Sequence, residues 1–314
     1  MKQSKKTLSI IFPVFENGQN LPHLYEEIVE FKKSLNNIDL ELIFIDDGST
    51  DNSFEEMEKI KKNFIGKTRL IQFTKNFGQA SALNCGWKIA KGDYIGNISS
   101  DQQDPLSIFN KMLEHLIKDN SIVIAARKKR NDGLTSDFIS KFFFSIVNRY
   151  VIKEYPPMGS DLMLFTKEVR DYLILRDERG NNEVALLLRS GYKYRFVYYE
   201  RHKRKYGKNK TSFFRKITAL IDIVFSNSYI PIRIVSIVGF FLGFFGISYG
   251  IFVIYKKFLE INSSVNLGWA STISIISIFS GFILISLGII GEYFWRILEN
   301  IKKPEWYTIN KFVK

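Results

Sequence analysis

Three clusters of acidic and polar residues follow short apolar runs in the first third of the chain. Their acidic members are Glu16, Asp46, Asp47, Asp101 and Asp104. Carboxylates do not bind phosphate directly; they hold it through a hard cation such as Mg²⁺ or Mn²⁺, or they hydrogen-bond a base or ribose. A single acidic loop is more often a solvated turn or a helix cap. Three such clusters at corresponding positions favour a site for a phosphate-bearing ligand.

The acidic clusters lie at the ends of predicted strands. Apolar runs predict strands over 8–14, 40–45, 69–74, 93–98 and 121–126, alternating with helices over 20–35, 51–64, 79–90 and 105–116. This alternation predicts an α/β fold with a mostly parallel, doubly wound sheet. Ligands of such sheets bind beyond the carboxyl ends of the strands, so the five carboxylates should face one crevice. The chain has no G-x-G-x-x-G after the first strand and no G-x-x-x-x-G-K-[ST], which disfavours dinucleotide oxidoreductases and P-loop NTPases.

Composition narrows the class of protein. The chain has 314 residues, of which 46% are apolar, so it is neither a disordered chain nor a collagen or coiled-coil rod. The single cysteine, Cys85, excludes an intramolecular disulfide and a Cys-rich zinc site. The three histidines are scattered and predict no His-based metal site.

Two long stretches near the carboxyl end carry no charge, namely 234–254 and 261–291. About 20 apolar residues suffice for a membrane-spanning helix, so we expect spans at about 234–254 and 269–291 rather than buried core helices. No signal peptide is expected, because the first apolar run is short and broken by Pro13. Basic residues before and after the pair of spans outnumber Lys256 and Lys257 between them, which predicts that both ends lie in the cytoplasm.

The formal net charge of +13 is concentrated in one segment, because Arg195–Lys216 holds nine basic residues and one acidic residue. This distribution does not fit a nucleic-acid binder with an extended basic surface. Two readings remain open for the segment, contact with anionic lipid headgroups and binding of a phosphate ligand. Apolar residues at helical spacing over Ser212–Tyr229 favour an amphipathic helix at the membrane surface over a plain core helix.

Three motifs together carry a family resemblance. They are Ile11–Asn17 (IFPVFEN), Ile45–Asp51 (IDDGSTD) and Asn76–Leu83 (NFGQASAL). With them the chain resembles family-two glycosyltransferases of the Rossmann-like GT-A fold, and in particular the membrane-anchored polyprenyl-phosphate glycosyltransferases. The resemblance covers nearly the whole chain. It implies a cytoplasmic catalytic domain over 1–210, a juxtamembrane helix over 211–232, two spans within 233–295 and a cytoplasmic tail over 296–314.

The resemblance also implies roles for individual residues. Those matched to the nucleotide-sugar site are Pro13, Phe15, Glu16, Asp46, Asp47, Ser100 and Asp101. The family's metal motif, D-A-D-L-Q-D-P, corresponds here to residues 99–105, with Ser99 replacing the first aspartate. A Mg²⁺ or Mn²⁺ ion would then rest on Asp101 with support from Gln103. One carboxylate fewer should weaken the binding of the cation.

Downstream matches supply the acceptor side of the expected site. Asp161, in the segment Gly159–Phe165, matches the family's candidate catalytic base. The residues matched to binding of phosphate and acceptor are Arg127, Arg201, Arg204 and Lys210. In the same loop Asn209 stands where the family usually has serine.

The implied function is inverting transfer of a sugar from a nucleotide sugar, such as UDP-glucose, to undecaprenyl or another polyprenyl phosphate at the cytoplasmic face of the plasma membrane. Use of GDP-mannose is an alternative, as is a catalytically weak membrane scaffold or flippase partner, which Ser99 alone supports. A processive polysaccharide synthase is disfavoured because the chain lacks Q-x-x-R-W. Related enzymes form oligomers, so a homo-oligomer stays open, and no nucleic-acid partner is expected.

Overall fold

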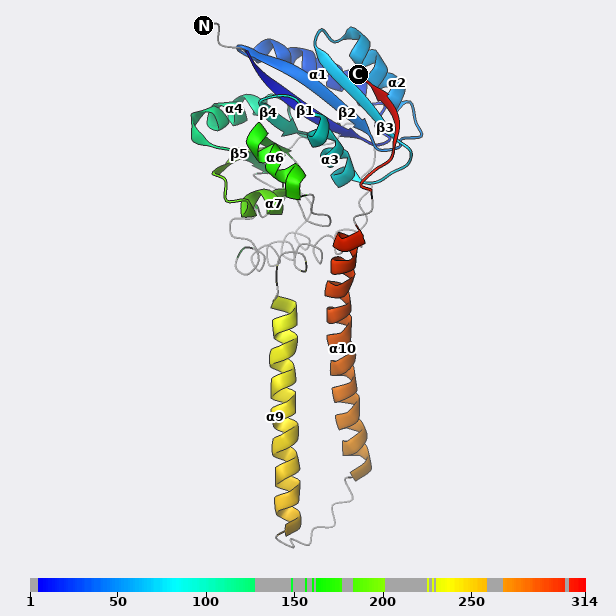
Figure 1. Cartoon of the computed structure of the whole chain (residues 1–314), viewed down its shortest axis with the longest axis vertical. Coiled ribbons are helices and arrows are strands. Elements are labelled where there is room, and N and C mark those ends of the chain that lie inside the picture. The colour runs from blue at the N-terminus through cyan, green and yellow to red at the C-terminus, as the bar shows by residue number, and fades with distance from the viewer. Residues whose placement is uncertain are drawn as a thin grey trace. The chain divides into compact units, whose positions relative to one another are not determined.

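The computed structural model describes residues 5–127, 148, 156, 160, 162–176, 183–200, 225, 228, 230–258, 268–302 and 305–314. The chain divides into two compact units (Figure 1). Unit 1 consists of Met1–Ile217 together with Pro304–Lys314, and unit 2 is Thr218–Lys303. The last residues of the chain therefore belong to the same unit as the first.

Unit 1 is built on an eight-stranded sheet with the order β7-β5-β6-β4-β1-β2-β3-β8. Its strands are β1 (Lys6–Val14), β2 (Ile38–Asp46), β3 (Lys67–Phe73), β4 (Tyr94–Asn97), β5 (Ile122–Arg127), β6 (Leu162–Thr166), β7 (Tyr194–Tyr199) and β8 (Ile309–Val313). Strand β1 pairs in parallel with β2 and β4, as β2 does with β3 and β5 with β7. Strand β6 runs antiparallel to β4 and β5, and β8 runs antiparallel to β3. The expected α/β class with a mostly parallel sheet is confirmed.

The helices of unit 1 alternate with the strands over the first half of the chain. They are α1 (Leu21–Ser34), α2 (Ser53–Asn63), α3 (Gln79–Ile89), α4 (Ile108–Asp119), α6 (Lys167–Arg176) and α7 (Glu183–Arg189). The first four correspond to the four helices predicted from sequence, with ends that differ by up to three residues. In α1 the apolar residues at helical spacing are all buried, from Leu21 to Phe31, as their spacing predicts.

Apolar layers cover both faces of the sheet and fix the strands that carry the acidic loops. On β1, Leu8, Ile10, Phe12 and Val14 share a buried cluster with residues of α1, α2 and α4. The rings of Phe12 and Phe44 stack across β1 and β2 with centroids 4.8 Å apart. The opposite face packs on α3, where a Cβ at Gly86 would lie 2.4 Å from Ile11. The strands are therefore held from both sides, as alternation along a buried strand requires.

Strand β8 lies in the segment that the sequence analysis treats as a tail. It pairs with β3 at the edge of the sheet, and the N–H of Thr74 donates to the carbonyl of Thr308 at 3.0 Å. Just before it, the ring of Tyr307 stacks on Phe73 with centroids 4.8 Å apart and an interplanar angle of 8°. The chain thus returns to unit 1 after its last long helix.

Unit 2 contains two long helices, α9 (Ile230–Phe258) and α10 (Gly268–Lys302). Their apolar windows, Ile230–Phe252 and Ile278–Trp295, have mean hydropathies of 2.1 and 1.7, and none of either window is buried. The alternative of buried core helices is therefore wrong, and both helices are long and apolar enough to cross a membrane. The helices approach each other where a Cβ on Gly239 would lie 3.1 Å from Phe282. The predicted helix over 212–229 falls outside the described residues except at Phe225 and Ser228.

Candidate functional site

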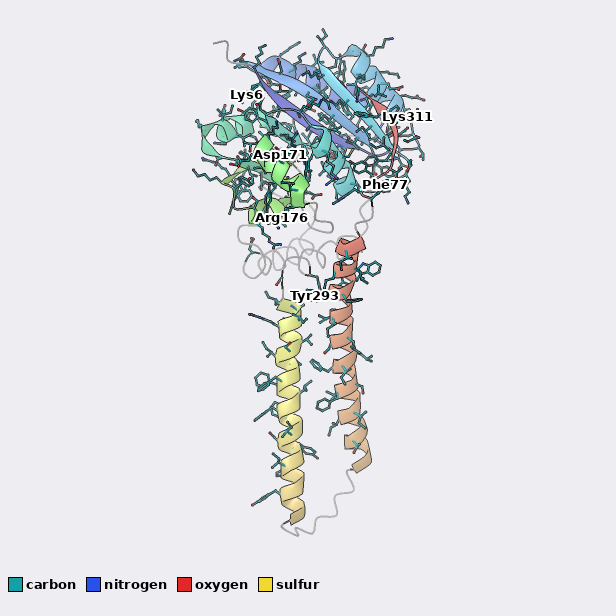
Figure 2. The ribbon with its side chains drawn as sticks, viewed as in Figure 1. Lys6, Phe77, Asp171, Arg176, Tyr293 and Lys311 are labelled. Atoms are coloured by element: carbon teal, nitrogen blue, oxygen red, sulfur yellow. The ribbon has the colours of Figure 1, made fainter. Side chains whose placement is uncertain are left out.

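The loops that follow β1, β2 and β4 meet at the carboxyl edge of the sheet. Val14 and Asp46 are register partners at the ends of β1 and β2, and the N–H of Asp47 donates to the carbonyl of Val14 at 2.8 Å. On the other side of β1, the N–H of Ile98 donates to the carbonyl of Ile11 at 3.1 Å. Figure 2 shows the two edges of the sheet: Lys6 lies at the amino edge, where β1 begins, and Phe77 lies at the carboxyl edge, in the loop after β3. The structure therefore brings the three acidic loops together.

Asn17 ties the first loop to the other two. Its Nδ2 donates to the carbonyl oxygen of Ser100 at 2.7 Å and to the Ser100 hydroxyl at 2.8 Å. The Ser100 hydroxyl in turn donates to the carbonyl of Pro13 at 3.0 Å. The N–H of Asn17 donates to the hydroxyl of Ser53 at the start of α2. Ser100, expected to bind the nucleotide sugar, is buried and holds two loops together.

Phe15 and Glu16 are exposed at this edge. Glu16 adopts a positive φ of 44°, which turns the chain out of β1. Its N–H donates to the hydroxyl of Ser49 at 2.8 Å, and the hydroxyl of Thr50 lies 3.4 Å from its carboxylate. The ring of Phe15 is 37% exposed. Of the residues matched to the nucleotide-sugar site, these two are open to a ligand.

Asp46 and Asp47 are buried, with 0% and 4% exposure. Asp46 accepts from the N–H of Ser49 at 3.0 Å and from the amide of Gln72 at 2.9 Å. Asp47 accepts from the N–H groups of Phe77 and Gly78 at 2.7 and 2.9 Å. Burial raises the pKa of Asp47, and these two donors oppose that rise. Both carboxylates therefore fix the turn after β2 and the loop before α3.

The turn after β2 requires Gly48 and is closed by Asp51. Gly48 has a φ of 72°, and a Cβ there would lie 2.3 Å from the Lys75 backbone. The Asp51 carboxylate accepts from the N–H of Gly18 at 3.1 Å and from the N–H and hydroxyl of Ser53. Burial alone would raise the pKa of Asp51, but the hydrogen bonds from Ser53 and Gly18 outweigh it and lower the pKa. The last aspartate of the IDDGSTD motif thus joins the first two loops.

Asp101 lies in the loop after β4 at the margin of the buried region. It is 9% exposed, and its carboxylate accepts from the N–H of Gln103 at 3.2 Å. Gln102 between them has a positive φ of 56°. In the part of the chain that the structure describes, no three His, Cys, Asp or Glu residues gather as a metal site. A hard cation at this loop would take few ligands from the described residues, and oxygens of a bound ligand can supply the rest, as they commonly do for Mg²⁺.

Asp104 is held by a residue that the sequence analysis missed. The hydroxyl of Tyr199, at the end of β7, donates to Asp104 Oδ1 at 2.5 Å, and Asp104 is 2% exposed. Tyr199 is the register partner of Arg127 on β5. Burial and the Asp104 charge raise the pKa of Tyr199, which Arg127 partly opposes. Arg127 thus lies beside the loop that follows β4, at the same edge as the acidic clusters.

Four expected site residues lie outside the described residues, namely Asp161, Arg201, Arg204 and Lys210. The described neighbours of Asp161 are Ser160 and Leu162. The hydroxyl of Ser160 donates to the carbonyl of Ala125 on β5 at 2.5 Å, and Leu162 is the register partner of Ala125. Ser160 and Leu162 are therefore both held at Ala125, which lies two residues before Arg127 on β5.

The similarity to known proteins extends beyond the eight-stranded sheet and covers nearly the whole chain. Residues 9–173 match the family model described as Glycosyl transferase family 2. An uncharacterized glycosyltransferase of Synechocystis sp. is 28% identical over 305 residues, covering 96% of this chain and 94% of that protein. The SfII prophage-derived bactoprenol glucosyl transferase of Shigella flexneri is 28% identical, covering 97% of each chain. The undecaprenyl-phosphate 4-deoxy-4-formamido-L-arabinose transferase of Proteus mirabilis is 25% identical, covering 98% of this chain and 94% of that protein.

Similarity is also found among solved structures. The mannosyltransferase PcManGT from Pyrobaculum calidifontis, in complex with GDP-Man and Mn²⁺, has a TM-score of 0.49 and 15% identity. This match covers 71% of this chain and 64% of that chain. The three relatives, by contrast, align over both units, α9 and α10 included, because each covers at least 96% of this chain.

Proposed function

The chain belongs to glycosyl transferase family 2, and from that premise we propose that it transfers a sugar from a nucleotide sugar to a polyprenyl phosphate, with inversion. One observation carries the proposal: relatives named for bactoprenol and undecaprenyl phosphate align over 97% and 98% of this chain. The names of these relatives specify different sugars but related lipids, bactoprenol and undecaprenyl phosphate. The lipid phosphate is therefore the firmer part of the proposal, with UDP-glucose as the first donor to test and GDP-mannose as the alternative.

The donor would lie across the loops after β1 and β2. Phe15 and Glu16 are exposed there and can contact the nucleotide, next to Pro13. Asp46, Asp47 and Ser100 would act through the loops that they hold, because their polar atoms are already engaged within the protein. Such internally bonded loops present a ligand surface that needs little rearrangement on binding.

Asp101 and Gln103 would hold a divalent cation together with the donor's diphosphate. When bound, Mg²⁺ or Mn²⁺ would neutralise charge on the leaving diphosphate. Ser99 supplies no carboxylate at the position where the resemblance expects one. The protein then supplies few of the cation's ligands. The cation should therefore bind together with the nucleotide sugar, whose diphosphate supplies the others.

The acceptor would be held by cationic residues. Arg127 lies beside Tyr199 at the carboxyl edge, and we assign Arg201, Arg204 and Lys210 to the lipid phosphate. Arginine forks and lysine point charges are suited to phosphate oxygens. The second pKa of a phosphate monoester is about 6, so the attacking oxygen is mostly ionised at neutral pH. Asp161 would then position the acceptor or take a residual proton rather than supply most of the rate.

The two apolar helices would anchor the enzyme where its acceptor resides. We place α9 and α10 across the plasma membrane, with unit 1 and both termini in the cytoplasm. Connectivity supports this topology, because the chain leaves unit 1 at Ile217 and re-enters it at Pro304. Two crossings between these points bring the chain back to the side from which it left. The excess of basic residues flanking the pair of helices is in accord with the same orientation.

A transfer assay tests the proposal. Membranes containing the full chain receive undecaprenyl phosphate, Mg²⁺ or Mn²⁺, and one labelled donor per reaction: UDP-glucose, UDP-N-acetylglucosamine, UDP-galactose or GDP-mannose. Label should enter the organic phase with one donor and disappear with EDTA. Asp101→Asn should lower the rate by about 100-fold or more, since it removes the cation's carboxylate.

Asp39→Asn is the matched control, because the Asp39 side chain is 62% exposed near the start of β2, away from the acidic loops. It should retain the full rate. Absence of label from every donor, with the protein folded and inserted, would contradict the proposal and favour the scaffold alternative that Ser99 supports.

A further inference from the structure

A cavity of about 600 Å³ lies at the amino edge of the unit 1 sheet, opposite the acidic loops. Its lining includes six basic side chains, Arg69, Lys88, Lys91, Lys167, Arg170 and Lys314. They come from β3, the end of α3, the loop before β4, the start of α6, and the residue after β8. Among the described residues that line the cavity, none is acidic.

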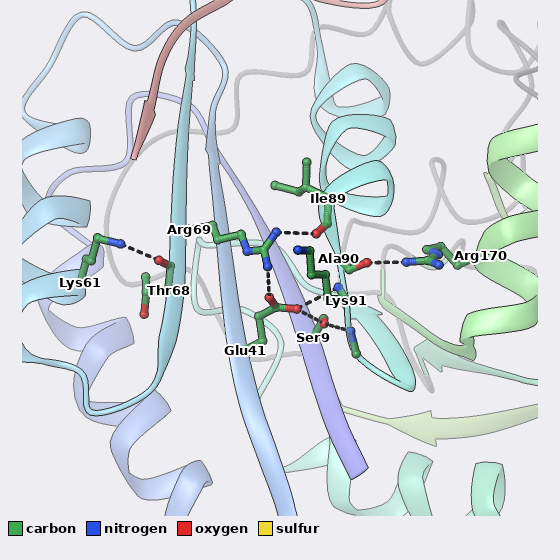
Figure 3. A network of polar contacts seen from close by, with 10 residues as sticks. Ser9, Glu41, Lys61, Thr68, Arg69, Ile89, Ala90, Lys91 and Arg170 are labelled. Carbon is green, nitrogen blue, oxygen red and sulfur yellow. Dashed lines mark hydrogen bonds and ion pairs between the residues drawn. The ribbon is translucent and has the colours of Figure 1, made fainter. Parts of the chain in front are cut away.

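Arg69 is held in place by a buried network (Figure 3). Its guanidinium pairs with Glu41 at 3.0 Å and donates to the carbonyl of Ile89 at 2.9 Å. Glu41 is 1% exposed and also accepts from the Ser9 hydroxyl at 2.5 Å and the N–H of Lys91 at 3.0 Å. The network joins β1, β2 and β3 to the end of α3. The Arg69 charge is therefore fixed at the cavity wall.

Arg170, on α6, is likewise held by a backbone carbonyl near the end of α3 and by an acidic side chain. It donates to the carbonyl of Ala90 and pairs with Asp171 at 2.5 Å. The two arginine side chains are only 18% and 11% exposed. Both satisfy carbonyls at the carboxyl end of α3, where the helix dipole favours cations. A purely structural role thus accounts for the arginines.

Four lysines also line the cavity. Lys88, Lys91, Lys167 and Lys314 are all exposed, and they add four like charges around one cavity. Glu41 pairs with Arg69 and Asp171 pairs with Arg170, and neither acidic residue lines the cavity. Like charges gathered at short range raise the free energy of the folded protein unless an anion lies among them. The cavity therefore has the charge of an anion site, with two arginines held in place and four exposed lysines around them.

We propose that this cavity binds an anion carrying two or more phosphate groups, either free in solution or on a lipid headgroup. Arginine forks and lysine ammonium groups are the side chains best suited to phosphate oxygens. Strand β3 has seven residues, so its two ends are on the order of 20 Å apart. The cavity is therefore a second site, distinct from the acidic loops. A ligand in it would join β8, through Lys314, to α3 and α6.

Calorimetric titration with pyrophosphate tests the proposal on the full chain in detergent. EDTA is present throughout, so that cation-dependent binding at the acidic loops does not contribute. The test variant is Lys91→Gln with Lys167→Gln, since both side chains are exposed and neither belongs to the proposed donor site. The control variant, Lys62→Gln with Lys111→Gln, removes the same charge from exposed positions on α2 and α4.

Pyrophosphate should bind the wild type and the control alike, and the test variant about tenfold or more weakly. It should also raise the melting temperature of wild type and control, because a ligand that binds only the folded state stabilises it. In nanodiscs, competition by cardiolipin, whose headgroup carries two phosphates, but not by phosphatidylcholine would identify a lipid headgroup as the ligand. Equal binding by both lysine variants, or no binding by the wild type, would overturn the proposal.

Discussion

Asp46, Asp47 and Asp104 are each at most 4% exposed, and each accepts hydrogen bonds from within the protein. At the same edge Glu16 is exposed and Asp101 lies at the boundary. The acidic residues therefore divide into those that fix the loops and those that a ligand can reach. A change in the first group should act through geometry, and a change in the second through direct contact.

Tyr199 offers a direct test of the loop-fixing role. Tyr199→Phe removes the hydroxyl that donates to Asp104 and leaves the ring in place. We expect kcat/KM for sugar transfer to fall about 10-fold to 100-fold, because the loop that carries Asp101 loses a support. The cation concentration for half-maximal rate should rise in parallel, which the same assay measures across a Mn²⁺ titration.

Tyr198→Phe is the control on the same strand, since Tyr198 is 59% exposed. It should change neither kcat/KM nor the dependence on cation. A Tyr199→Phe enzyme with normal cation dependence and a lowered melting temperature would assign Tyr199 to stability alone.

The positions of the carboxylates could be predicted from the sequence, but their hydrogen-bond partners could not. Asp46, Asp47 and Asp101 follow apolar runs, so the parallel sheet was enough to predict that they share an edge. Their hydrogen bonds depend on residues far along the chain: Gln72 lies 26 residues from Asp46, and Tyr199 lies 95 from Asp104. Such pairs arise only when the strands are in register. No local spacing encodes them.

At the scale of elements, β1 to β5 were predictable and β6 to β8 were not. The first five are apolar runs separated by helices with regular spacing, which is a strong local signal. Strand β8, with the sequence INKFV, is mostly exposed and follows a long apolar helix. Its pairing with β3 spans most of the chain, so its place in the sheet is set by tertiary contacts rather than by propensity.

The attachment of β8 to the sheet can be tested at Tyr307. Its ring stacks on Phe73, the last residue of β3. Tyr307→Ala should lower the free energy of unfolding of unit 1 by about 1–3 kcal/mol, through lost aromatic contact and burial. Urea unfolding of the full chain in detergent, followed by tryptophan fluorescence, measures the shift.

Tyr198→Ala serves as the matched control, because it removes an exposed ring from β7. Its cost should stay below about 1 kcal/mol. If the two variants unfold at the same urea concentration, the Tyr307 ring contributes nothing specific to holding β8.

At the scale of the whole molecule, connectivity constrains how the chain can lie in a membrane. Unit 1 is assembled from Met1–Ile217 and Pro304–Lys314, with α9 and α10 between them in sequence. Strand β8 cannot pair with β3 across a bilayer, so an even number of crossings must separate Ile217 from Pro304. Two crossings satisfy this requirement and one does not. The pairing of β8 with β3 therefore supports the part of the proposed topology that places both segments of unit 1 on one side of the membrane.

Single cysteines can test that topology in intact cells with a membrane-impermeant maleimide. The native Cys85 is buried, and burial raises its pKa to about 11, so the folded wild type should remain unlabelled. Ser264→Cys, between α9 and α10, should react from outside. Lys62→Cys on α2 and Glu305→Cys before β8 should react only after the cells are opened, because both belong to unit 1. Labelling of Glu305→Cys from outside while Lys62→Cys stays protected would contradict the pairing of β8 with β3 in the membrane-bound protein. It would also contradict the argument for two crossings.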